Sequence, residues 1–196
     1  GLRNSQKVEV RIPDSVEFSI LGNVDSIDLP KLSVDPYPYQ EFGMRWLASM
    51  YNQGVGALLG DQMGLGKTIQ LIGLAVYCLQ NTPKAKILVV TPSSLIGNWE
   101  REFNKFSPNS RIYTHVGSER LFTLSELSKH DIVLTSYDVL IRDTDLLARA
   151  NWNLLICDEA HSLKNPDSLR RIAIQSLKSN SKILATGTPV ENQLLD

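Results

Sequence analysis

The feature that most constrains the fold of this 196-residue chain is an alternation of two sequence patterns. Helical spacing of apolar residues recurs at 67–80, 93–106, 119–130 and 167–178. Around these segments lie short apolar runs of strand-like composition, at 55–60, 85–91, 131–137, 153–160 and 182–188, with a weaker run at 111–116. Uninterrupted apolar strands separated by helices predict an α/β fold, with a mostly parallel sheet and helices on both faces. In such folds ligands bind at the carboxyl ends of the strands.

The start of the chain departs from this alternation, and we expect an N-terminal extension at residues 1–35 ahead of one lobe at residues 36–196. Within the extension, residues 7–20 alternate between apolar and polar side chains on either side of a Pro-Asp-Ser turn, which predicts a short β-hairpin. The polar stretch 22–38 is rich in Asp, Ser and Pro, and it predicts a connector.

Composition limits where such a chain works and what it can bind. The formal net charge is -1 at pH 7, so any nucleic-acid contact must come from a few local groups. The two cysteines, Cys78 and Cys157, lie inside apolar runs and are expected to be reduced thiols in the core. No apolar run is long enough to span a bilayer and no leader opens the chain, so we expect no membrane partner. The predicted location is the cytoplasm for a bacterial source or the nucleus for a eukaryotic one.

The stretch GDQMGLGKT lies between a predicted strand and a predicted helix, which is the context of a phosphate-binding loop. Gly64 and Gly66 allow backbone N–H groups to face an anion, and the N-terminus of the following helix adds a favourable dipole. Lys67 can reach the β- and γ-phosphates, and the hydroxyl of Thr68 can bind Mg²⁺. Because Asp61 stands where the usual pattern has its first glycine, the alternative is a glycine turn followed by an exposed lysine.

A second acidic motif follows another predicted strand, in LLICDEAH. Asp158 is placed to hold Mg²⁺ through water, and Glu159 can orient and deprotonate the attacking water. Two acids after a strand also occur at helix N-caps, so they are weak evidence alone. Their pairing with the GKT loop favours a nucleotide site.

Taken together, these motifs resemble a known family. GLGKT at 64–68, DEAH at 158–161 and TGTP at 186–189 resemble the first RecA-like lobe of helicase superfamily two. Longer stretches resemble the Swi/Snf-type ATPases, which translocate on duplex DNA: DQMGLGKT, VVTPSSLIGNWEREFNKF, LTSYDVL, CDEAHSLKN and ATGTPVENQLLD. The resemblance covers about residues 38–196. It implies a RecA-like P-loop domain that contains a DEAH box.

The phosphate loop departs from that family at two positions. The family usually reads DEMGLGKT, so Asp61 in place of glycine is expected. Gln62 replaces an acid and Gly60 replaces a usual alanine. Neither change alters the lysine or the threonine, so we expect altered local hydrogen bonding with nucleotide binding kept.

The resemblance implies a set of residues for the expected cofactors, ATP and Mg²⁺. Gln40, in YPYQEFGMRWL, reads the base edge, with an exposed helix residue as the alternative. Pro36 and Tyr37 replace a Leu-Arg pair of the family. The other cofactor-binding residues are Gly64, Leu65, Gly66, Lys67, Thr68 and Ile69. Catalysis is assigned to Glu159, Lys67 and Asp158, with Mg²⁺ held by Thr68 and Asp158.

The resemblance also implies a surface for the nucleic-acid backbone and a segment that couples it to ATP. The backbone contacts are Thr91, Pro92, Ser93, Ser94, Thr135, Ser136 and Tyr137. Hydroxyls and N–H groups at strand ends bind phosphates without reading sequence, and helix capping is the competing interpretation. The coupling residues are Thr186, Gly187 and Thr188, with His161 facing them. Trp46, Trp99 and Trp152 have the spacing of packing residues, and we assign all three to the core.

The expected partners are duplex DNA, a second RecA-like lobe of the same parent chain, and a protein partner through residues 1–35. No second lobe is recognised in this sequence, and such a lobe supplies arginines worth about 10³ to 10⁵ in rate. We therefore expect this chain alone to hydrolyse ATP poorly. The alternatives are the lobe of an RNA helicase or of a restriction-type translocase, and an ATP-switch binding module without turnover.

Overall fold

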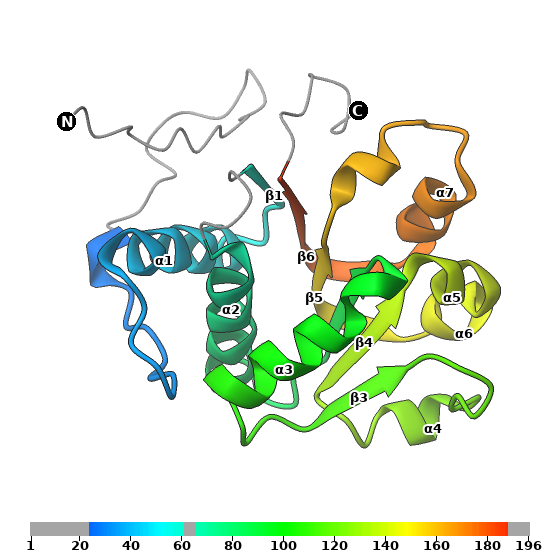
Figure 1. Ribbon diagram of the computed structural model, residues 1–196, viewed down its shortest axis with the longest axis horizontal. Helices are drawn as coiled ribbons and strands as arrows, with labels where there is room; N and C mark the ends of the chain where they lie inside the picture. Colours follow the sequence, from blue (N-terminus) through cyan, green and yellow to red (C-terminus); the bar gives the residue numbers. More distant parts are fainter. Residues whose placement is uncertain (1–23, 61–65, 188–196) are drawn as a thin grey trace.

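The computed structural model describes residues 24–60 and 66–187, which form one α/β lobe around a single sheet (Figure 1). The predicted hairpin at 7–20 lies outside the described residues. All neighbouring strands are parallel, in the order β1-β6-β5-β2-β4-β3, which confirms the predicted fold class. The strands are β1 (Ala57–Gly60), β2 (Ile87–Thr91), β3 (Ile112–His115), β4 (Ile132–Ser136), β5 (Asn151–Cys157) and β6 (Lys178–Thr186).

Helices cover both faces of this sheet. The α-helices are α1 (Pro38–Asn52), α2 (Lys67–Asn81), α3 (Ile96–Phe106), α4 (Leu124–Leu127), α5 (Tyr137–Arg142), α6 (Thr144–Leu147) and α7 (Leu169–Ser176). Short 3-10 turns are η2 (Val24–Ser26), η3 (Ser93–Leu95) and η4 (Ala160–Leu163). Among the described residues, no helix is long and apolar enough to cross a membrane.

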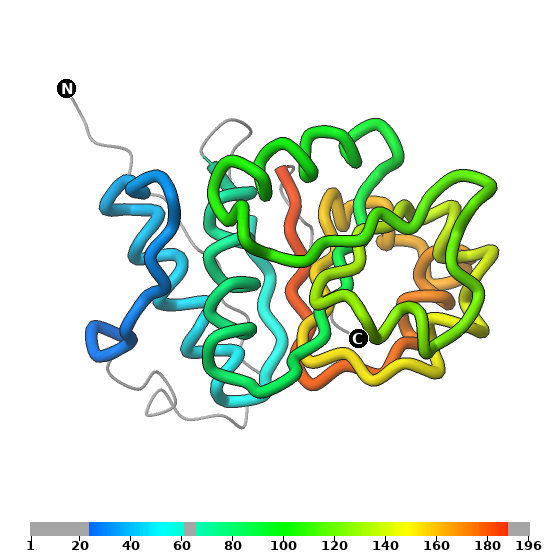
Figure 2. The backbone as a smooth tube through the Cα atoms, turned by 90° about the horizontal axis from the view of Figure 1, so that it is seen from below, coloured from blue at the N-terminus to red at the C-terminus, as the bar shows by residue number. Residues whose placement is uncertain are grey.

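Two hydrophobic cores separate the sheet from its two helical layers. Alternate strand residues face opposite sides, so Ile87 and Val89 pack with α1, α2 and α3, while Leu88 and Val90 pack with α5, α6 and α7. In Figure 2 the blue and cyan segments lie at one end of the molecule and the yellow and orange segments at the other. The near-continuous apolar strands of the sequence are therefore the strands that are buried on both faces.

Two local predictions from the sequence are wrong. A helix was expected over 119–130, but only Leu124–Leu127 is helical, with the side chain of Thr123 as its N-cap. The strand predicted at 131–137 ends one residue early, because the hydroxyl of Ser136 accepts from the N–H of Val139 and begins α5. The predicted strand therefore includes Tyr137, which is the first residue of α5.

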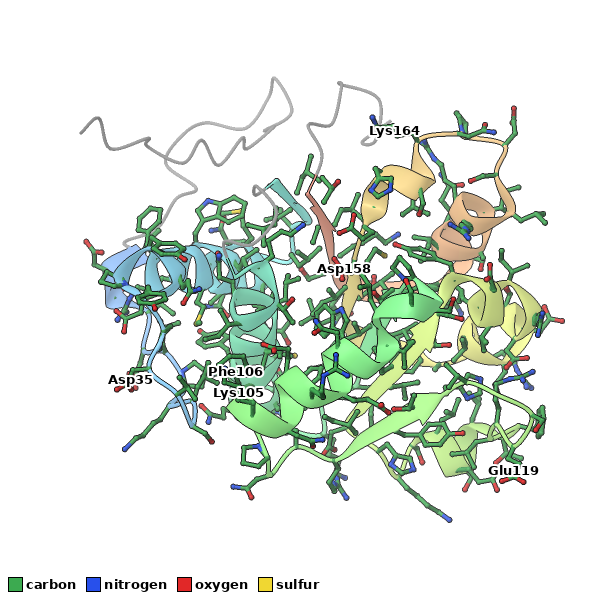
Figure 3. All side chains as sticks on the ribbon, in the orientation of Figure 1. Asp35, Lys105, Phe106, Glu119, Asp158 and Lys164 are labelled. Carbon is green, nitrogen blue, oxygen red and sulfur yellow. The ribbon has the colours of Figure 1, made fainter. Side chains whose placement is uncertain are left out.

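Residues 24–35 pack against the lobe. Leu32 is buried in the same core as α1 and α2, and the N–H of Ser33 donates to the carbonyl of Phe106 at 3.0 Å. The guanidinium of Arg45 donates to the carbonyl of Ile27. Figure 3 labels Asp35 and Phe106 in this part of the molecule. The stretch predicted as a connector is therefore attached to the lobe; the division at residue 36 stays a prediction.

The carboxyl ends of the strands line one edge of the sheet, because all strands run in the same direction. In register, Gly60 pairs with Thr186 and Thr91 pairs with Ser136. Asp158 follows β5 directly, between these two pairs of strands. Thr91, Ser136 and Thr186 therefore lie at this edge with Asp158, and Gly60 ends β1 there ahead of the glycine-rich loop.

Candidate functional site

The first part of the site is the start of α2. Gly66 is the N-cap residue and has left-handed backbone angles, φ 80° and ψ 39°, which a glycine adopts without steric cost. Lys67 follows as the first residue of the helix, and its Nζ atom is buried without a hydrogen-bond partner among the described residues. A carboxylate oxygen, Oε1 of Glu159, lies 4.0 Å from this nitrogen. A buried ammonium at a helix N-terminus favours an anionic ligand.

Gln40 lies against this loop. A Cβ atom added at Gly66 would be 2.1 Å from Nε2 of Gln40, so the two residues are in direct contact. Gln40 is 6% exposed, and its Oε1 accepts from the N–H of Tyr37 at 2.9 Å. The structure thus brings the predicted base-reading residue to the phosphate loop, and it excludes an exposed helix residue at this position. Its role in base recognition stays a prediction.

The second part of the site is the carboxylate of Asp158, which is held from two sides. Its Oδ2 accepts from the indole Nε1 of Trp99 at 2.8 Å and from the hydroxyl of Thr91 at 3.3 Å. Its Oδ1 accepts from the N–H of Glu159 at 2.9 Å. Figure 3 shows Asp158 between α3 and the central strands. These three hydrogen bonds therefore fix the carboxylate plane.

The backbone of Asp158 is held as well. Its N–H donates to the carbonyl of Val90 at 2.8 Å, and its carbonyl accepts from the hydroxyl of Tyr137 at 2.6 Å. Burial raises the pKa of Tyr137 well above its ordinary value, so the hydroxyl remains protonated and can donate. Burial likewise raises the pKa of the neighbouring Cys157 thiol to about 12, which keeps this strand end free of thiolate.

Glu159 has backbone angles that non-glycine residues rarely adopt. Its φ of 49° lies in the left-handed region, which costs a non-glycine residue roughly 1 kcal/mol or more. Its Oε2 lies 3.1 Å from Nδ1 of His161, and Lys67 lies near its other oxygen. The carboxylate thus has two nitrogen groups within reach. His161 was expected to face 186–188; the structure places it beside Glu159, and its coupling role stays a prediction.

The predicted nucleic-acid residues divide into two groups. Thr91 and Thr135 are fully buried, and Tyr137 is 1% exposed. All three hydroxyls donate inside the protein. Those of Thr91 and Tyr137 donate to Asp158, and that of Thr135 donates to the carbonyl of His115. A phosphate contact through these hydroxyls would require those bonds to break. Pro92 is partly exposed, Ser93 and Ser94 are exposed, and Ser136 caps α5.

The remaining predicted residues are placed as follows. Thr68 is half-buried in the first turn of α2, and Ile69 is a core residue, so Ile69 can offer a ligand only its backbone N–H. Thr186 is fully buried at the end of β6, and Gly187 follows it. Gly64, Leu65 and Thr188 lie outside the described residues.

The contact of Trp99 with the site is the feature that the sequence analysis missed. All three tryptophans are buried, which confirms their assignment to the core. Trp99 also donates to Asp158, a contact between positions 59 residues apart. By contrast, Trp152 donates to the backbone carbonyl of Leu147 at 3.0 Å. The only signal in the sequence is that Trp99 lies on the helix that follows Thr91, a strand end at the site.

Comparison with known proteins places this geometry in a family. Residues 39–196 match the model of the SNF2-related domain. The chain is 36% identical to the Sulfolobus solfataricus SWI2/SNF2 ATPase core in complex with dsDNA, with a TM-score of 0.78 over 86% of this chain and 35% of that one. A second structure of that core domain matches with a TM-score of 0.74 and 33% identity, over 94% of this chain and 36% of that one.

Curated relatives come from distant organisms. Helicase SWR1 of Debaryomyces hansenii is 38% identical over 93% of this chain and 12% of the relative. The putative ATP-dependent helicase/translocase YwqA of Bacillus subtilis is 34% identical over 100% of this chain and 23% of the relative. The chain thus spans less than a quarter of the length of these relatives. Because the family model covers most of the chain and the fold matches, this chain belongs to the SNF2-related domain family.

Proposed function

We propose that this chain is the ATP-binding lobe of a DNA-dependent ATPase that translocates on duplex DNA. The observation that carries the proposal is the buried Lys67 ammonium, unpartnered by hydrogen bonds within the described residues, at the N-terminus of α2 and opposite Glu159. The relatives support it, since one is a putative ATP-dependent helicase/translocase and one solved neighbour is in complex with dsDNA.

The residues at the start of α2 fit a triphosphate. The N–H groups of the first turn have no intrahelical partner and point along the helix axis towards an anion. Lys67 supplies the cation. Because Gly66 has no side chain, the amide of Gln40 can lie directly against the backbone of the loop. ATP bound here with Mg²⁺ would supply the transferable γ-phosphoryl group, and the groups at the start of α2 would bind and position it.

Mg²⁺ would be held by the hydroxyl of Thr68 and by Asp158 through a water molecule. A carboxylate has about four lone-pair directions, and three of those on Asp158 already accept hydrogen bonds from Trp99, Thr91 and Glu159. One direction remains for an outside donor such as a metal-bound water. Mg²⁺ normally keeps several of its waters, so an indirect contact suits it.

Glu159 would be the general base. Its carboxylate is partly exposed at the site, and Lys67 and His161 are the groups that compete for it. When Lys67 turns to the phosphates, one oxygen of Glu159 becomes available to accept a proton from the attacking water. His161 holds the other oxygen and so keeps the carboxylate oriented.

The proposal includes partners outside the described lobe. A second RecA-like lobe would supply the arginines that stabilise charge on the γ-phosphate, so this chain alone would turn over slowly. The exposed hydroxyls of Ser93 and Ser94 would contact phosphates of duplex DNA. The extension at 1–35 would contact a protein partner.

The test is ATP hydrolysis by the full-length protein with duplex DNA, single-stranded DNA or RNA, at one salt concentration. We expect duplex DNA to stimulate turnover more than the other two. Glu159→Gln should keep nucleotide affinity and lose about 10² to 10⁴ in turnover. Stimulation by RNA alone would point to an RNA helicase, and no stimulation with normal binding would point to an ATP switch. Normal turnover in Glu159→Gln would remove the general-base assignment.

A further inference from the structure

We propose that Trp99 is a positioning residue that fixes the carboxylate of Asp158 for a divalent cation. The inference rests on the proposed function, since it concerns the metal side of the same nucleotide site. It gives Trp99 a role beyond filling the core, which is all that its burial and spacing indicate.

The indole of Trp99 is itself firmly placed. It is the fourth residue of α3, it is 1% exposed, and its ring packs against that of Phe103 with 5.8 Å between ring centroids. Its Nε1–H donates to Oδ2 of Asp158 at 2.8 Å. An indole has one donor and no acceptor, so this bond uses its entire polar capacity.

The carboxylate depends on this donor more than on the others. Thr91 reaches the same oxygen at 3.3 Å, which is long for a hydroxyl donor. The N–H of Glu159 holds only the other oxygen, at 2.9 Å. Without the indole N–H, Oδ2 would keep one weak partner and the carboxylate plane could turn about its bond to Cβ.

Such a rotation would matter at a water-mediated metal contact. The one acceptor direction of Asp158 left for a bound water is defined by the three directions already used. Groups that orient metal ligands typically account for about 10- to 100-fold in metal affinity or activity when they are removed. Trp99 therefore acts on the metal through Asp158 and does not touch it.

The chain contains a matched control for this role. Trp152 is 3% exposed and its indole N–H also has one partner, the carbonyl of Leu147 at 3.0 Å. It lies in the core on the opposite face of the sheet. Trp99→Phe and Trp152→Phe each remove one buried indole hydrogen bond, so both should lower stability, with the larger loss at Trp99 because its acceptor is a carboxylate. Only Trp99→Phe removes a donor from Asp158.

The experiment measures how Mg²⁺ supports binding of AMP-PNP, a nucleotide analogue that is not hydrolysed, to the full-length protein by calorimetry. We expect Trp99→Phe to raise the Mg²⁺ concentration for half-maximal binding by about tenfold. Its affinity for AMP-PNP without metal should stay within about twofold of wild type. Trp152→Phe should change neither value. If Trp99→Phe does not fold, benzothienylalanine at position 99 keeps the ring size, replaces the N–H by sulfur, and should give the same shift.

Two results would overturn the inference, and they are distinguishable. If wild type binds AMP-PNP with Mg²⁺ but the position-99 and position-152 variants show equal Mg²⁺ requirements, Trp99 is only a core residue and the proposed function stands. If wild type shows no Mg²⁺-dependent binding of AMP-PNP, the proposed function fails and the inference fails with it.

Discussion

The two sides of the candidate site, at Lys67 and at Asp158, differ in how far their charged groups are hydrogen-bonded within the protein. On the Lys67 side, a buried ammonium has no hydrogen-bond partner within the described chain. On the Asp158 side, the backbone N–H, the backbone carbonyl and both carboxylate oxygens all have partners, contributed by β2, α3, α5 and the adjoining residues. Within the described residues, the ammonium of Lys67 thus has no hydrogen bond and one carboxylate 4.0 Å away, whereas the carboxylate of Asp158 accepts three hydrogen bonds.

This difference indicates which side of the site should contribute more to the free energy of ligand binding. A buried cation without a partner is unfavourable in the free protein, and an anionic ligand removes that penalty on binding. A carboxylate that is already oriented loses little further freedom when a metal-bound water arrives. The phosphate side should therefore control affinity, and the acidic side should contribute stability and geometry.

The strongest test of this contrast is Lys67→Ala. A hydrogen bond to a charged group is worth about 1.5–3 kcal/mol, so nucleotide affinity should fall roughly 10- to 100-fold. The melting temperature without ligand should stay the same or rise, because the change removes a buried ammonium that has no hydrogen bond among the described residues and only a 4.0 Å contact with Glu159. Calorimetric titration and thermal melting measure the two effects. Lys31→Ala is the control. Lys31 is exposed and precedes α1, so this change should alter neither the nucleotide affinity nor the melting temperature.

A clear drop in the melting temperature of Lys67→Ala would contradict the contrast. It would mean that the ammonium is already stabilising the free protein, for example through Glu159 at 4.0 Å.

Much of this arrangement could be predicted from the sequence. The apolar runs at 85–91 and 153–160 correspond to the central strands β2 and β5, because strands buried on both faces must be apolar throughout. Lys67 and Asp158 follow strand ends in a parallel sheet, so their meeting at one edge is a consequence of the topology. Local patterns therefore predicted the sheet and the placement of Lys67 and Asp158 at one edge of it.

Other features depend on contacts that no local pattern carries. The bond between Trp99 and Asp158 joins residues 59 apart, and that between Tyr137 and Asp158 joins residues 21 apart. The burial of the hydroxyls of Thr91 and Thr135 likewise follows from tertiary packing. A threonine at a strand end has the same sequence signature whether its hydroxyl faces solvent or the core.

A second, smaller effect is expected at Gly66, which belongs to the Lys67 side. Gly66→Ala places a Cβ atom 2.1 Å from Nε2 of Gln40, so that side chain must move. Displacing one hydrogen-bonding group from the base should weaken ATP binding by about tenfold. Left-handed backbone angles also cost alanine roughly 1–2 kcal/mol of stability. Affinity is measured by titration and stability by urea unfolding.

Gly54→Ala separates the two contributions. Gly54 also has a positive φ, of 67°, but apart from its chain neighbours no atom of the described residues lies within 4 Å of an added Cβ. It should lose similar stability and keep its affinity for ATP. Equal affinities in Gly54→Ala and Gly66→Ala would show that Gln40 does not take part in nucleotide binding.

The smallest effect is expected on the Asp158 side, from Tyr137→Phe. The change removes the hydroxyl that donates to the carbonyl of Asp158 at 2.6 Å and leaves the ring under the guanidinium of Arg170, 5.4 Å from the ring centroid. The free energy of unfolding should fall by about 1 kcal/mol, the usual net value of one hydrogen bond. Urea unfolding measures this loss, and Tyr37→Phe, at a tyrosine that is 67% exposed, should show none.

Nucleotide affinity should stay within about twofold in Tyr137→Phe, because Val90, Trp99, Thr91 and the N–H of Glu159 still hold Asp158. That result would show that the backbone of Asp158 is anchored redundantly, so that losing the bond from Tyr137 to its carbonyl lowers stability without moving the carboxylate. A loss of affinity as large as that of Gly66→Ala would instead mean that the hydroxyl of Tyr137 sets the position of the whole strand end. Both sides of the site would then control affinity, and the contrast between them would disappear.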